Sequence, residues 1–292
     1  MDALLWAWVQ PKGTFLLAHI GWWIVGLWVA LWLFVWKFAK PVLRRSYRMM
    51  SYFRRIHVPF PRLVNLLKIR FDYQRLSGLP LTLAATVFLA VALLLTGVVE
   101  DVVEQDFIVQ FDHWIAASMA QAHTESVVSV FHTITLLGTP AIIVPLWMIA
   151  LIALSVLGNR YWAFPLFISF IGSISMATLG KYGFARPRPM EALFVIHSPS
   201  FPSAHSTLAM SFYAVCFYLW WRRTTGWNGQ VLITFTGMSF VLLLSGSRII
   251  IGVHYVSDVL AGLLLGSLWF IIAISLYEWM NLKHYIQFRS DQ

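Results

Sequence analysis

Long runs of uncharged, mostly apolar residues alternate with short polar segments along the whole chain. Seven of these runs reach or come close to the roughly 20 residues that an α-helix needs to cross the hydrocarbon core of a bilayer. They span residues 14–36, 76–99, 126–159, 161–180, 192–221, 224–247 and 259–277. The pattern therefore predicts an all-α, polytopic membrane protein.

The third run, residues 126–159, is too long for one straight crossing. Gly138, Thr139 and Pro140 lie inside it, and glycine and proline interrupt helices or begin them. We therefore expect the run to be broken there, with its crossing helix beginning near Pro140.

A shorter amphipathic pattern lies between the second and third runs. Apolar residues recur at helical spacing between 107 and 119. They are Phe107, Ile108, Phe111, Trp114, Ile115 and Met119, and the residues on the other side are Asp106, Gln110, Asp112 and His113. This pattern predicts a helix that lies in the membrane interface.

The net charge of +9 raises the possibility of nucleic-acid binding, but the distribution of charge favours a membrane protein. The segment 37–75, between the first two runs, holds eleven of the Lys and Arg residues, and the positive-inside rule places such a segment in the cytoplasm. Threading the runs alternately from there puts 16 of the 21 Lys and Arg inside. Six acidic residues and no Lys or Arg fall in the outer segment 100–125. We expect no nucleic-acid partner.

Five basic residues remain on the outer side, where they are normally scarce. They are Lys12, Lys181, Arg186, Arg188 and Arg248. A charge at membrane depth costs about 2.5–3.5 kcal/mol or more, so such residues usually mark function. This group of outward-facing cations predicts an anionic ligand.

Three segments with complementary chemistry share this outer side: 181–189, 202–205 and 247–258. Lysine and arginine neutralise phosphate oxygens, and Ser203 with the first N–H groups of a following helix can donate to the same anion. His254 and Asp258 are spaced i, i+4 at the start of a helix, so the carboxylate can hold the imidazole in its nucleophilic tautomer. Together the segments indicate phosphoryl chemistry with histidine as the attacking group.

The order and spacing of these residues resemble the three motifs of the type 2 phosphatidic acid phosphatase (PAP2) superfamily. The motifs read Lys181, six residues, Arg188-Pro189; then Pro202-Ser203-Ala204-His205; then Ser247-Arg248, five residues, His254, three residues, Asp258. The resemblance covers about 79–277 and implies a six-helix PAP2-like core, to which this chain adds an N-terminal transmembrane helix.

The resemblance also implies a role for each motif residue. His254 would attack phosphorus, Asp258 would orient it, and His205 would protonate the leaving oxygen. The phosphoryl oxygens would be bound by Lys181, Arg188, Ser203, the Ala204 amide and Arg248. The family needs no metal and no other cofactor, and few carboxylates lie near these segments to bind magnesium.

Two details depart from a simple match. The second motif usually has glycine where this chain has Ala204, although the backbone donor survives the methyl group. Arg186-Pro187 repeats Arg188-Pro189; the spacing selects Arg188 and leaves open whether Arg186 contacts the headgroup.

Gly262 and Gly266 form a G-x-x-x-G pattern, which favours close helix packing over a site.

The resulting division of the chain has four parts. Residues 1–40 form an N-terminal transmembrane anchor, 41–75 a basic cytoplasmic segment, 76–278 the PAP2-like catalytic membrane domain and 279–292 a cytoplasmic tail. The protein is expected in a bacterial inner membrane, with its active site on the extracytoplasmic side and its C-terminus in the cytoplasm.

The function implied by the resemblance is hydrolysis of phosphate from a membrane lipid. Candidate substrates are phosphatidic acid, phosphatidylglycerol phosphate and undecaprenyl or another polyprenyl diphosphate. Two alternatives stay open: a phosphotransferase on the same scaffold, and a non-catalytic lipid-binding or transport protein. The second alternative leaves the presence of both His205 and His254 unexplained.

Overall fold

The computed structural model describes residues 25–39, 41, 79–157, 160–194 and 196–290. Within these residues the regular structure is helical, with no strand. Five helices are long and apolar enough to cross a membrane. The prediction of an all-α, polytopic membrane protein is confirmed, and the chain is an integral membrane protein.

The helices follow the order of the apolar runs. The long ones are α5 (Leu79–Glu104), α8 (Pro140–Val156), α9 (Arg160–Phe184), α12 (Trp227–Ile250) and α13 (Val256–Ser290). The short ones are η2 (Val35–Ala39), α6 (Phe107–Ala122), α7 (Glu125–Leu136), α10 (Ala204–Leu208), η3 (Ala209–Tyr213) and α11 (Ala214–Arg223). Because α10, η3 and α11 continue into one another, they make a sixth helical rod about 30 Å long.

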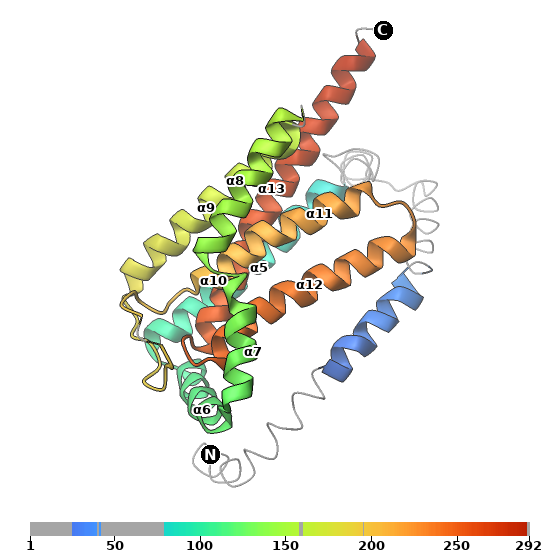
Figure 1. The fold of residues 1–292 in the computed structure, drawn as a ribbon. Helices are drawn as coiled ribbons and strands as arrows, with labels where there is room; N and C mark the ends of the chain where they lie inside the picture. Colours follow the sequence, from blue (N-terminus) through green and yellow to red (C-terminus); the bar gives the residue numbers. More distant parts are fainter. Residues whose placement is uncertain (1–24, 40, 42–78, 158–159, 195, 291–292) are drawn as a thin grey trace, which may run out of the picture.

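The break predicted in the third apolar run is confirmed. α7 ends at Leu136 and α8 begins at Pro140, which occupies the first turn of the helix. Proline suits that position because its missing N–H is not needed there and its φ is already helical. The break turns the chain between α7 and the crossing helix α8 (Figure 1).

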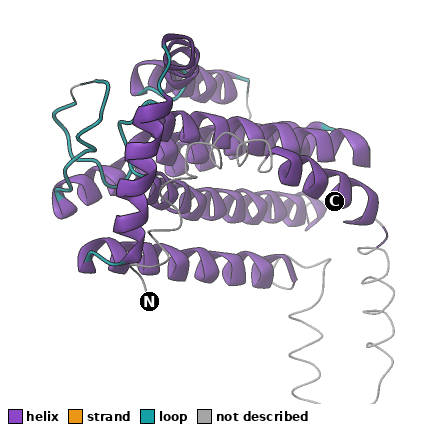
Figure 2. Cartoon of the chain, turned by 90° about the horizontal axis from the view of Figure 1, so that it is seen from below, coloured by secondary structure: helices purple, strands orange, loops and turns teal. Residues whose placement is uncertain are grey.

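One end of the helix bundle carries most of the irregular chain. In Figure 1, α6, the loop 185–203 and the turn before α13 gather at the end opposite the C-terminus. The end of α8, the start of α9 and the α11–α12 connection lie toward the C-terminal end. The largest loop, in teal, projects at one end of the bundle in Figure 2. The segments expected to share a face therefore meet there.

The last helix, α13, packs against α9, α5 and α10. Close approach to α10 depends on two glycines: a Cβ on Gly262 would lie 2.5 Å from the Ser203 carbonyl oxygen, and one on Gly266 would lie 2.7 Å from the Thr207 carbonyl oxygen. Backbone atoms cannot move aside easily, so only glycine fits. This confirms the close packing predicted for the G-x-x-x-G pattern.

Within the segment predicted as the N-terminal anchor, the structure describes an apolar helix, Val25–Phe38. It lies along α12 (Figure 1), where Trp28 Nε1 donates to Ser239 Oγ at 2.9 Å and Trp36 Nε1 donates to Asn228 Oδ1 at 3.0 Å. The rest of the predicted anchor, and residues 42–75 of the basic segment, lie outside the described residues. At the other terminus, α13 continues unbroken past 278 to Ser290.

The amphipathic helix is present as α6, and its buried face includes a polar residue. Val109, Asp112 and Ala116 are buried, whereas Phe107 is 68% exposed. Asp112, which the pattern groups with the polar residues, is therefore on the buried face of the helix. The face made by these three residues turns toward the start of α13, where the Asp112 carboxylate finds hydrogen-bond donors.

Candidate active site

A tight turn brings His254 from the end of α12 to the start of α13. The backbone N–H groups of Val253 and His254 both donate to the Arg248 carbonyl, at 3.1 and 3.3 Å. Gly252 has φ +71°, and a Cβ on it would lie 3.2 Å from the Glu191 carbonyl oxygen. Glycine is favoured here because it adopts positive φ without a steric penalty.

The structure brings His254 and Asp258 together, as their spacing predicted. Nδ1 of His254 lies 3.2 Å from Asp258 Oδ2, and Nε2 lies 3.2 Å from Arg188 Nη1. Arginine has donors and no acceptor, so Nε2 must accept and Nδ1 must carry the proton. The lone pair of Nε2 is thus on the side away from the carboxylate, which is the tautomer a nucleophile needs.

The imidazole of His254 is also held neutral. Its burial lowers its pKa well below the ordinary 6.5, and the nearby charges of Arg188, Arg248 and Lys181 lower it further. Burial disfavours the charged form because water cannot solvate it, and neighbouring cations repel an added proton. The neutral, nucleophilic form is therefore the resting form.

Arg188 ties the loop 185–203 to the turn that carries His254. Its Nε donates to Ser198 O at 2.9 Å and its Nη1 to Val253 O at 2.7 Å, while Nη2 lies 3.1 Å from Ser198 Oγ and 3.3 Å from Pro199 O. With the contact to His254, all five guanidinium donors have a partner. Lys181, from the last turn of α9, donates from Nζ to Pro199 O at 2.5 Å.

The second motif is joined to the third through the backbone. Ser203 N–H donates to the Asp258 carbonyl at 2.9 Å. Ser203 is the N-cap of α10, its Oγ accepting from Ser206 N at 3.4 Å, so Ala204 presents one of the first amides of that helix. His205 follows on the same turn.

Two buried polar atoms at this end have no partner among the described residues: His205 Nε2 and Arg248 Nε. Arg248 is otherwise fixed by its Nη1, which donates to Thr135 Oγ1 of α7 at 3.0 Å. His205 lies within electrostatic reach of Arg248, His254, Arg188 and Lys181. Buried polar atoms are rarely left unpaired, so these two indicate a place for a ligand.

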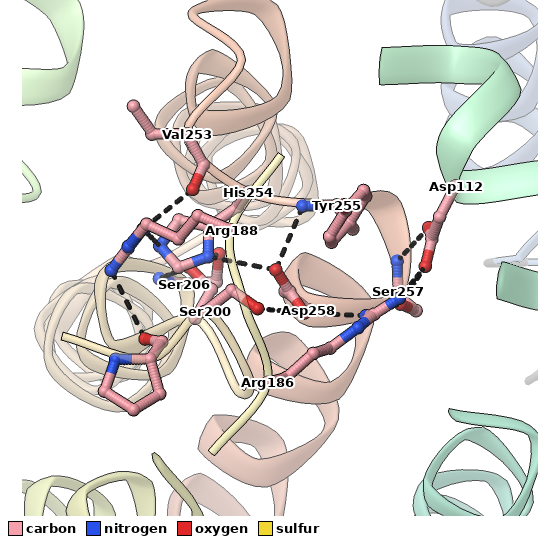
Figure 3. Close-up of polar contacts among 12 residues, drawn as sticks. Asp112, Arg186, Arg188, Ser200, Ser206, Val253, His254, Tyr255, Ser257 and Asp258 are labelled. Atoms are coloured by element: carbon pink, nitrogen blue, oxygen red, sulfur yellow. Dashed lines mark hydrogen bonds and ion pairs between the residues drawn. The ribbon is translucent and has the colours of Figure 1, made fainter. Parts of the chain in front are cut away.

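Arg186 does not extend toward a headgroup. It is only 8% exposed, and its Nη1 and Nη2 donate to Asp258 Oδ1 and Asp112 Oδ2, both at 2.9 Å (Figure 3). The possibility that it contacts the lipid headgroup is wrong for this structure. Two buried carboxylates need a positive partner, and Arg186 is that partner.

Sequence reasoning missed Asp112, Thr135 and Ser257 as contributors to the site. Asp112 and Thr135 lie far from the motifs in sequence, and each satisfies a buried arginine. One signal was available for Asp112: with Val109 and Ala116 it follows the i, i+3, i+7 spacing of a buried helix face. Among the described residues, no three or more His, Cys, Asp or Glu side chains come together as metal ligands.

Comparison with known proteins agrees with this arrangement. The family model of the PAP2 superfamily matches residues 162–282. A curated relative, "Putative undecaprenyl-diphosphatase YbjG" of Escherichia coli (strain K12), is 34% identical over 91 residues, which are 31% of this chain and 41% of the relative. The match thus spans less than half the length of that relative.

The comparison with solved structures found two matches. The first transmembrane PAP2 type phosphatidylglycerolphosphate phosphatase from Bacillus subtilis superposes with a TM-score of 0.55 at 24% identity, covering 65% of this chain and 93% of that one. LpxE of Aquifex aeolicus has a TM-score of 0.45 at 22% identity, covering 56% of this chain and 94% of that one. The first of these shows a shared fold.

Proposed function

We propose, from the premise that residues 162–282 belong to the PAP2 superfamily, that this chain is a metal-independent membrane lipid phosphatase acting through a phosphohistidine. The observation that carries the proposal is the pair of histidines. His254 presents an unprotonated Nε2 at 3.2 Å from Arg188. His205, on the adjoining helix, has a buried Nε2 that no described residue satisfies.

The first step is attack by His254 Nε2 on phosphorus. The N–P bond forms as the P–O bond to the lipid breaks, and the ring becomes cationic. Asp258, which holds Nδ1–H, stabilises that charge in the manner of a catalytic triad. His205 gives a proton to the leaving oxygen and then takes one from the water that hydrolyses the N–P bond. Inorganic phosphate leaves and His254 is regenerated.

The phosphoryl oxygens are bound by Lys181, Arg188, Arg248, Ser203 and the Ala204 amide. Arg188 exchanges its contact with His254 for one with phosphate, since both partners are acceptors. The phosphate also brings negative charge among three cations, and this favours the proton that His205 must carry at the start of the step.

The substrate is an amphiphile whose hydrocarbon part stays in the bilayer while its headgroup enters the loop end of the bundle. The positive-inside pattern of the sequence supports an extracytoplasmic position for that end. The names of the similar proteins point to undecaprenyl diphosphate and phosphatidylglycerol phosphate as the first lipids to test, with phosphatidic acid as the third.

Phosphate release by the detergent-purified protein tests the proposal. With EDTA present, we expect release from at least one of the three lipids, and inhibition by vanadate, which mimics the five-coordinate phosphoryl centre. Transfer of the phosphoryl group to an acceptor lipid without release would assign a phosphotransferase instead. Neither release nor transfer from any lipid would contradict the proposal.

The lowered pKa of His254 predicts the pH dependence of kcat/KM. Because the ring stays neutral through pH 6.5 and below, it loses reactivity only in stronger acid. The second ionisation of a phosphomonoester, with a pKa of about 6, is then the first to appear as pH falls. We expect the acid limb to follow the pKa of whichever substrate is used, as measured separately for each substrate by phosphorus NMR. A limb that stays near pH 6.5 whatever the pKa of the substrate would show that His254 titrates normally.

A further inference from the structure

A chain of buried charges continues beyond Asp258, on the side away from His254 (Figure 3). Arg186 bridges Asp258 Oδ1 and Asp112 Oδ2, each at 2.9 Å. Both carboxylates are fully buried and the arginine is 8% exposed. Since water does not reach these groups, their charges act on one another with little screening.

Asp112 is fixed at both oxygens. The backbone N–H of Ser257 donates to its Oδ1 at 2.9 Å, and the Ser257 hydroxyl donates to its Oδ2. The same hydroxyl oxygen accepts from Arg186 Nη1 at 2.7 Å. The Tyr255 ring lies 4.4 Å from the guanidinium carbon and shields it. Hydrogen bonds and ion pairs therefore join Asp258, Arg186, Asp112 and Ser257 in one buried unit at the start of α13.

The charge of this unit matters for His254. When Nε2 attacks phosphorus the ring becomes cationic, and a negative Asp258 lowers the energy of that state. Arg186 fixes Asp258 in position but cancels its charge. The second carboxylate, Asp112, offsets Arg186, so the three groups together remain negative. The ion pair between Arg186 and Asp258 would be enough to hold the loop against α13. The additional carboxylate of Asp112 changes the net charge near His254.

We propose that Arg186 and Asp112 are positioning residues for the phosphoryl transfer, and that Asp112 acts by preserving the negative charge that Asp258 presents to His254. The inference rests on the proposed function, and extends the catalytic network to α6, outside the three motifs. Neither residue touches the substrate; both act through Asp258.

Three variants separate an electrostatic role from a structural one. Asp112→Asn keeps the shape and removes one negative charge, Arg186→Gln removes the positive charge, and the double variant removes both. We expect Asp112→Asn to lower kcat about 10–100-fold with little change in KM, by analogy with the loss of the groups that orient metal-binding residues. In Arg186→Gln two buried carboxylates are left without their cation, so one of them takes up a proton and Asp258 no longer holds a fixed charge and position. The double variant removes this conflict and leaves Asp258 as the single charge, so its kcat should be higher than that of Arg186→Gln.

Losses of kcat that simply multiply in the double variant, or an unchanged kcat in Asp112→Asn, would overturn the proposal. Asp106→Asn is the matched control, because Asp106 precedes the same helix, is exposed and makes no side-chain cap bond. Its kcat should equal that of the wild type.

A second readout does not depend on turnover. In histidine-labelled protein, with the His254 signals assigned by their absence in His254→Gln, the Nδ1 proton resonance reports the strength of its bond to Asp258. We expect Asp112→Asn to move it upfield and Asp106→Asn to leave it in place. An inactive wild type would defeat the proposed phosphatase, whereas an active wild type with an unmoved resonance in Asp112→Asn would defeat only this inference.

Discussion

Replacing His254 with alanine is expected to abolish phosphate release, lowering kcat by about 10⁴–10⁶-fold, the loss seen when a catalytic nucleophile is removed. The reason is chemical: no other described side chain places an unprotonated nitrogen between Asp258 and Arg188. The measurement is the initial rate of phosphate release at saturating lipid. Rapid acid-free quenching of the wild type should also trap a phosphoryl group on the protein that the variant lacks.

The matched control for this variant is His132→Ala, since His132 is an exposed histidine of α7, where its ring contacts Phe194. It should release phosphate at the wild-type rate. Thermal unfolding of both variants checks that the fold is retained. Turnover near the wild-type rate in folded His254→Ala would rule out histidine attack by this residue.

Replacing His205 with glutamine is expected to lower kcat for a lipid phosphomonoester, such as phosphatidylglycerol phosphate, by about 10²–10⁴-fold, the usual contribution of a general acid. An alkoxide is a poor leaving group and needs a proton, which His205 is positioned to supply. A phenolate with electron-withdrawing substituents leaves without one. The loss should therefore shrink markedly when the substrate is an aryl phosphate of low leaving-group pKa.

The comparison of the two substrates is what identifies the role of His205. The His254→Ala variant should lose both activities equally, since both require the nucleophile. An equal loss for lipid and aryl phosphate in His205→Gln would show that His205 binds phosphate or shapes the loop, and would reject proton donation to the leaving group.

Sequence reasoning reached those features that depend on local pattern. Run lengths set by the bilayer predicted the crossing helices, and Pro140 marked the start of α8 because proline is favoured in the first turn of a helix. The G-x-x-x-G pattern that begins at Gly262 predicted close helix packing. The structure gives the reason, since a Cβ on Gly262 would meet the Ser203 carbonyl. The meeting of His254 with Asp258 followed from helical spacing alone.

The parts that were missed depend on contacts between distant segments. Asp112 and Arg186 are 74 positions apart, and Thr135 and Arg248 are 113 apart. No periodicity within either segment encodes such a pair. The pairing of Asp112 with Arg186 could have been inferred from hydrogen-bonding requirements. A cation buried beside a site needs an acceptor, and an acidic residue on the buried face of α6 needs a donor.

The two arginine contacts also bear on where the functional unit begins. The segment 162–282, which matches the family, contains every motif residue. It contains none of the partners that α6 and α7 supply. A piece of chain cut at 162 would retain Arg186 and Arg248 but lose Asp112 and Thr135. A buried charge stripped of its partner costs about 3–5 kcal/mol. The shortest part of the chain that keeps both arginines paired is accordingly longer than the matched segment and includes α6 and α7.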